Sequence, residues 1–152
     1  MIKKIKKKEI KMRDITKLMI AKYKLLELKY DFMGYEFNKE RELSFHHLVI
    51  PHRLCIVQHI PEEGYIEWNG AILKQNTAHN YIHIIERYDR DMFDAITREM
   101  IEENDKGYLD LKNICYIDDV LRNFEREYSG ARTKNGKPLI KEEYTRRLVR
   151  RR

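Results

Sequence analysis

The chain has 152 residues, which is enough for one domain with a core of ordinary size. Charged residues make up 37% of the sequence, and no apolar run approaches the roughly 20 residues that cross a bilayer, so we expect no membrane association. Two isolated cysteines indicate a reducing compartment rather than a disulfide framework, and the lysine-rich start lacks the apolar region of a signal peptide. We therefore expect a cytoplasmic protein.

Positive charge is concentrated at the two ends of the chain. Residues 1–13 carry seven Lys/Arg and one Glu, and residues 129–152 carry nine Lys/Arg and two Glu. Because the net charge is +6, residues 14–128 carry −7. Two basic ends on an acidic body suit a protein that binds phosphates, but they also suit solubilising tails, and charge alone leaves both open.

The first part of the chain predicts a helix and then a strand. Apolar residues at helical spacing predict a helix that has Asp14 as its cap and ends near Tyr30. Residues 31–43 show no clear pattern. The apolar run over residues 45–50 predicts a strand, which Pro51 ends.

A second strand is expected after a long connection over residues 52–68. Within that connection, residues 65–68 alternate like a strand. The pair Asn69-Gly70 is a turn signal, and residues 71–73 predict a short apolar strand behind it.

The rest of the chain predicts helices, because apolar residues recur at helical spacing. Thr77 can cap the first of them. Glycine, proline and basic residues over 129–138 indicate a linker. Four helices are expected. The first follows Thr77, the second follows a break at residues 89–91, the third begins near Asn113 and the fourth begins near Leu139.

Four of the six histidines form two pairs. His46 and His47 end the first strand, and His79 and His83 are four residues apart, so they share one face of a helix. Neutral imidazole is a common ligand of divalent transition metals. Either pair alone is more often surface or core, but the two pairs together predict a metal site.

The segments SFHHLVIP at residues 44–51, NGAIL at 69–73 and HNYIH at 79–83 resemble the HNH endonucleases. The resemblance is closest to the all-histidine type of bacteriocin nuclease domains and small phage-like HNH proteins, and it covers roughly residues 44–86. It implies a ββα-metal motif, in which two strands and a helix enclose one metal ion. The structural zinc site of many relatives cannot form, because it needs two Cys-x-x-Cys pairs.

The resemblance also implies roles for single residues. His47 would be the general base, and Asn69 would brace the loop that carries it. Asn76 is a rival for the role of Asn69, since the spacing between the segments departs from the family pattern. Three residues would be the metal ligands: His46, His79 and His83.

One divalent ion is expected at these ligands. Three imidazoles favour Zn²⁺ or Ni²⁺ in affinity, and Mg²⁺ or Mn²⁺ are further candidates. A zinc protease is not expected, because Asn80 stands where that motif needs a glutamate. Nothing in the sequence orients Cys55 as a nucleophile.

The expected fold is α+β and helix-rich, with the ββα-metal motif surrounded by helices. Residues 1–30 would form a basic arm and helix, residues 31–128 the nuclease domain, and residues 129–152 a basic linker and C-terminal helix. The expected substrate is DNA, with RNA as a second candidate. A metal-stabilised module that binds nucleic acid without cutting it is the alternative. The expected nucleic-acid contacts are Arg53, Arg146, Arg147 and Arg150.

Overall fold

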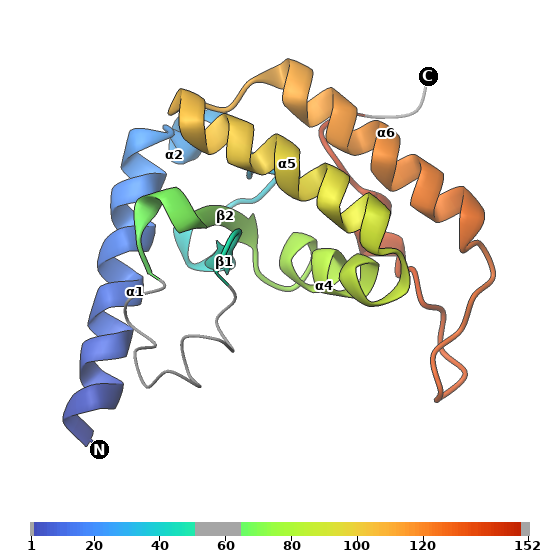
Figure 1. The fold of residues 1–152 in the computed structure, drawn as a ribbon, viewed down its shortest axis with the longest axis horizontal. Helices are drawn as coiled ribbons and strands as arrows, with labels where there is room; N and C mark the ends of the chain where they lie inside the picture. Colours follow the sequence, from blue (N-terminus) through green and yellow to red (C-terminus); the bar gives the residue numbers. More distant parts are fainter. Residues whose placement is uncertain (1, 51–64, 150–152) are drawn as a thin grey trace.

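The structure, a computed structural model, describes residues 2–50 and 65–149, with side chains described from residue 12 onward (Figure 1). This part of the chain contains α-helices and a two-stranded antiparallel sheet, so the expected α+β class is confirmed. No helix within these ranges has the length and apolar character to span a membrane. The elements are α1 (Ile2–Lys22), α2 (Leu25–Leu28), β1 (Leu43–His47), β2 (Gly70–Lys74), α4 (Ala78–Tyr88), α5 (Arg90–Lys106) and α6 (Leu111–Glu127).

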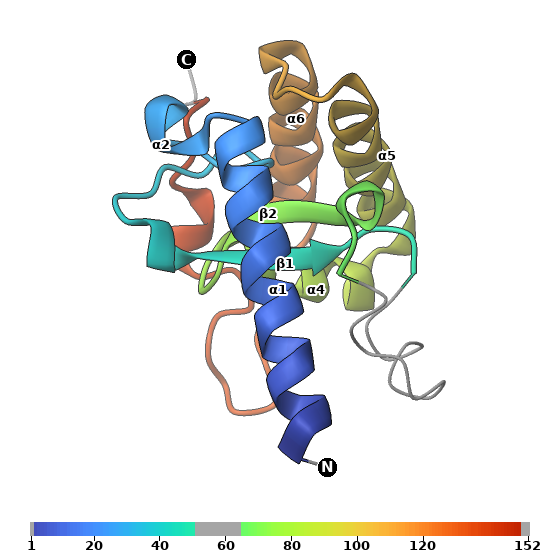
Figure 2. The same cartoon turned by 90° about the vertical axis from the view of Figure 1, so that its left-hand side faces the viewer.

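The sheet lies between α1 on one side and the helices α4 and α5 on the other (Figures 1 and 2). Strand β1 pairs with β2 so that His46 is opposite Ala71 and His47 is opposite Gly70. The ring of Phe45 lies against Gly70, where a Cβ atom would come within 2.2 Å of it. Position 70 therefore requires glycine for this pairing to form.

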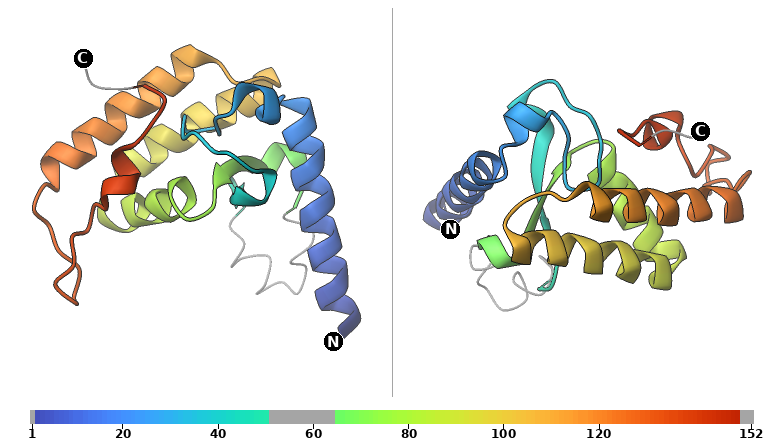
Figure 3. Two further views of the ribbon diagram at one scale, coloured as in Figure 1. Left: turned by 180° about the vertical axis from the view of Figure 1, so that it is seen from behind. Right: turned by 90° about the horizontal axis from the view of Figure 1, so that it is seen from above.

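Helices α4, α5 and α6 pack through the apolar stripes that the sequence predicts (Figure 3). Asp89 and Asp110 cap α5 and α6, since their side chains accept hydrogen bonds from Met92 N and Lys112 N at 3.1 and 2.9 Å. Thr77 occupies the cap position of α4, but its side chain makes no capping bond, contrary to the prediction.

The first helix is longer than predicted. It begins at Ile2, so Asp14 lies inside it and caps nothing. Lysine has a high helix propensity, and the Lys-rich start therefore continues the helix even without a regular apolar stripe. The helix ends at Lys22, and Lys24 adopts a left-handed conformation with φ of 56° before α2 begins.

The predicted helix from Leu139 does not form. Within residues 139–149, the only helical element is the 3-10 turn η4 (Glu142–Thr145). The segment packs through buried side chains that do not form one helical face. Tyr144 stacks on Tyr81 of α4 with ring centroids 4.7 Å apart. Residues 65–68 also differ from prediction, since they lead into the 3-10 turn η3 (Glu67–Asn69) instead of forming a strand.

Candidate metal centre

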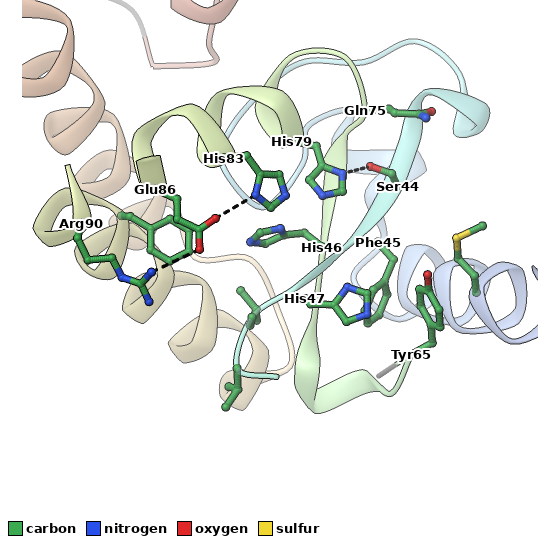
Figure 4. Close-up of a pocket in the computed structure, with 14 residues that line it drawn as sticks. Ser44, Phe45, His46, His47, Tyr65, Gln75, His79, His83, Glu86 and Arg90 are labelled. Atoms are coloured by element: carbon green, nitrogen blue, oxygen red, sulfur yellow. Dashed lines mark hydrogen bonds and ion pairs between the residues drawn. The ribbon is translucent and has the colours of Figure 1, made fainter. Parts of the chain in front are cut away.

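Three imidazoles converge from two elements of the fold (Figure 4). His46 comes from β1, while His79 and His83 lie one turn apart on α4. One ring nitrogen of each histidine lies within 4.8 Å of those of the other two. Zinc binds imidazole nitrogen at about 2.0–2.1 Å, so small side-chain movements allow all three to bind one ion. The three histidines can therefore hold a metal ion.

The environment of His46 suits a metal ligand. Its side chain is 2% exposed, and neither ring nitrogen hydrogen-bonds to any residue that the structure describes. Burial lowers the pKa of His46 well below its usual value, and the neighbouring histidines lower it further. The ring is therefore neutral and keeps a lone pair for a cation.

A hydrogen bond that His79 donates to Ser44 fixes the tautomer of His79. The Ser44 hydroxyl donates to Leu73 O at 3.1 Å, and its oxygen lies 2.7 Å from Nδ1 of His79. Because the single hydroxyl proton is already used, Nδ1 of His79 must be the donor. Its Nε2 then carries the lone pair. Burial, with a smaller effect of His83, lowers the pKa of His79 to about 4, so this ring is also neutral.

Glu86 orients His83 in the same way as Ser44 orients His79. Its Oε1 lies 3.2 Å from Nδ1 of His83, and because a carboxylate only accepts, Nδ1 donates, which in the neutral ring leaves the lone pair on Nε2. The other oxygen of Glu86 lies 3.5 Å from a guanidinium nitrogen of Arg90. Such outer partners are typical of metal-binding histidines, whose orientation they fix.

His47 lies on the opposite face of β1 from His46. Its ring contacts those of Phe45 and Tyr65, with centroid separations of 5.1 and 5.0 Å. The end of the strand nevertheless gives both histidines access to one cavity of about 590 Å³, which His79 also lines. A phosphate at the three imidazoles would thus share its cavity with His47.

Asn69 holds the segment that follows His47. Its side-chain oxygen accepts hydrogen bonds from Val49 N at 2.9 Å and Ile50 N at 2.7 Å, and its amide donates to Ile50 O at 3.0 Å. Asn69 is fully buried. Asn76 is exposed on the surface, and its backbone oxygen accepts a hydrogen bond from the side-chain amide of Asn80 at 3.4 Å. Asn69 is therefore the asparagine placed to brace the loop.

The structure contradicts one of the expected nucleic-acid contacts. Arg147 is 5% exposed and donates to Asp118 at 2.6 Å and to Glu125 at 2.7 Å, so its guanidinium is not available to a phosphate. Arg146 is exposed and pairs with Glu142. Arg53, Arg150 and Cys55 lie outside the described residues.

Sequence reasoning missed Ser44, Glu86 and Arg90. A partial signal existed, since Ser44 precedes His46 by two residues in a strand and so shares its face. Glu86 follows His83 by three residues on a helix, which also brings them together.

No family model, curated protein or solved structure matches the chain.

Proposed function

We propose that this chain is a metal-dependent endonuclease of the HNH type that hydrolyses phosphodiester bonds of DNA. In this proposal β1, β2 and α4 form the ββα-metal motif. The observation that carries it is the convergence of His46, His79 and His83 in a cavity that His47 also lines. No carboxylate is among these three donors, so a bound ion keeps its full positive charge for an anionic substrate.

A phosphodiester is anionic and resists attack by water, so catalysis needs charge neutralisation and a nucleophile. His46, His79 and His83 would hold a divalent ion, which would supply the first by stabilising negative charge on the phosphate and on the departing 3′ oxygen. Zn²⁺ and Ni²⁺ suit three nitrogen donors best in affinity.

His47 takes the proton of the attacking water, an effect typically worth about 10²–10⁴ in rate. Because His47 points away from the ligand face of β1, it can take this role while His46 binds the ion. Asn69 keeps the segment after His47 in place through its bonds to residues 49 and 50. The products are a 5′-phosphate and a 3′-hydroxyl.

The test is cleavage of supercoiled plasmid by the purified protein with Zn²⁺, Ni²⁺, Mg²⁺ or Mn²⁺, each with and without chelator. We expect metal-dependent cleavage, and we expect His47→Ala to lose it while binding metal with unchanged affinity. No cleavage with any of the ions would overturn the proposal. Loss of metal in His47→Ala would move His47 from the base to the ligands.

A further inference from the structure

A second cavity adjoins the metal centre through His83. It has a volume of about 470 Å³ and lies between α4 and the segment over residues 133–144. This segment runs close to the C-terminal half of α4 (Figures 1 and 3). Three of its lining side chains are cationic, and we call them the cationic groove: Arg87, Lys137 and Lys141.

The cations of this groove have no partner in the part of the chain that the structure describes. All three are exposed, and none of their side chains makes an ion pair or a hydrogen bond there. No Asp or Glu lines this cavity. By contrast, Arg90 and Arg146 are each paired with carboxylates. Three unpaired cations around one cavity repel one another, and an anion between them would relieve that repulsion.

The groove continues the line of the metal ligands. His79, His83 and Arg87 are spaced by four residues, so they form one stripe along α4, with a rise of about 6 Å between neighbours. A strand with one phosphate at the imidazoles would pass its next phosphates over Arg87. From there it would reach Lys137 and Lys141.

The segment that carries the two lysines is held in shape. Thr133 N donates to Lys137 O at 2.8 Å, and Leu139 N donates to Ala131 O at 2.9 Å. Leu139, between the two lysines, is buried. Tyr144 N also donates to Lys141 O at 3.0 Å, so the backbone at both lysines is fixed by hydrogen bonds and loses little entropy when they bind.

We propose that the cationic groove binds the sugar-phosphate backbone of DNA next to the phosphodiester that is cut. This inference rests on the proposed function, because it takes that phosphodiester to lie at the three histidines. An extended polyanion fits an open row of cations better than a single small anion does, since a small anion needs donors that converge on one point. Phosphate contacts fix the position of the nucleic acid without reading its sequence. The exposed amides of Asn80 and Asn135 also line the groove and can donate to phosphate oxygens.

The test compares two triple variants with equal loss of charge. The groove variant is Arg87→Gln, Lys137→Gln and Lys141→Gln. The control variant is Lys24→Gln, Lys29→Gln and Lys112→Gln, which changes exposed lysines near α2 and at the start of α6. Binding of a short labelled DNA duplex is measured by fluorescence anisotropy over a range of salt concentrations, with chelator present so that no cleavage occurs.

We expect the salt slope of the groove variant to fall by about 3, one unit for each lost phosphate contact, and that of the control variant to stay close to wild type. Equal slopes in wild type and groove variant would overturn the inference, as would equal losses in both variants. Binding of an RNA duplex but not of DNA would overturn the choice of DNA. Both sets of side chains are exposed, so we expect both variants to fold like wild type. Circular dichroism checks this.

The plasmid assay separates this inference from the proposed function. Cleavage by wild type together with an unchanged slope in the groove variant would overturn the groove and leave the nuclease standing. A salt slope that falls in the groove variant, without cleavage under any metal, would overturn the nuclease and leave the binding of DNA by the groove standing. It would support a module that binds nucleic acid without cutting it.

Discussion

The hydroxyl oxygen of Ser44 lies 2.7 Å from Nδ1 of His79, so a strand residue fixes the tautomer of a helix residue. Glu86 does the same for His83 from within the helix. In the neutral ring, both contacts leave the lone pair, which can bind a metal ion, on Nε2 of each histidine. Each of these rings thus has one nitrogen that could bind a metal ion.

We expect Ser44→Ala and Glu86→Gln each to weaken metal binding by about 10–100-fold, the usual effect of removing an outer partner of a histidine ligand. Competition with a chromophoric chelator measures the affinity. The control is Glu142→Gln, which removes an exposed ion pair outside the cavity that the three histidines line. Equal affinities in Glu86→Gln and wild type would contradict the role of Glu86.

His46→Leu should separate metal binding from stability. The buried imidazole of His46 has no hydrogen-bond partner within the described ranges, and such a group costs about 1–3 kcal/mol. In the presence of chelator we expect the Leu variant to be more stable than wild type. With metal, wild type should gain stability and the variant should not. Thermal unfolding with and without metal checks this, and a Leu variant that is still stabilised by metal would remove His46 from the ligand set.

Asn69→Ala should destabilise the protein, because Val49 N and Ile50 N would lose the acceptor that the buried Asn69 side chain provides. The expected cost is about 0.5–1.5 kcal/mol for each hydrogen bond lost. Urea denaturation measures the loss, and faster hydrogen exchange at the amides of residues 49 and 50 would locate it. Asn76→Ala is the control, since its side chain is exposed, and a similar loss in that variant would argue against Asn69 as the brace.

Arg147 and Arg146 are neighbours with opposite environments. Arg147→Met removes the guanidinium that pairs with Glu125 and that shares Asp118 with Arg122, and breaking such a buried ion pair typically costs about 3–5 kcal/mol. Arg146→Met changes an exposed side chain and should stay within about 0.5 kcal/mol. Urea denaturation of the two variants compares them directly. Removing residues 139–152 would therefore unfold the protein rather than test nucleic-acid binding.

Glu103 should make stability depend on pH. Burial raises the pKa of this carboxyl from 4.5 to about 9, and nearby acidic groups add to the rise. Between these two values the folded state holds a proton that the unfolded state has lost. The free energy of unfolding therefore falls as pH rises through this window, and it is greatest below the unfolded pKa.

Glu103→Gln removes this dependence and should be more stable than wild type at about pH 8, by at least about 1.4 kcal/mol, the equivalent of one pKa unit. Near pH 5 the two proteins should be closer in stability. Glu127→Gln is the control, because Glu127 is exposed on α6. A constant difference between Glu103→Gln and wild type at all pH values would contradict the assignment.

The parts of the fold that the sequence predicted well are those where one periodic stripe decides the structure. Tyr81, Ile82 and Ile85 form such a stripe on α4, and the same periodicity places His79 and His83 together on another face. The convergence of His46 with them was an expectation from resemblance, and no local pattern could have established it. It depends on the pairing of β1 with β2, which brings the strand beside the helix.

The parts that were mispredicted depend on contacts distant in sequence. The segment after Leu139 looks helical by composition, but the stacking of Tyr144 on Tyr81 and the ion pairs of Arg147 hold it in another form. Arg147 looks like part of a basic tail, because its carboxylate partners are more than 20 residues away. Periodicity within one segment contains no information on such partners.

Strand β2 leads into α4 through the short connection over residues 75–77, and β1 meets α4 through the hydrogen bond between His79 and Ser44. A cation bound by both His46 and α4 would add a link between β1 and α4. Loss of the ion would then lower the local stability of β1 and α4 first, before any change in the packing of α5 on α6. Occupancy could be followed through amide exchange in β1 and α4 alone, with no substrate present.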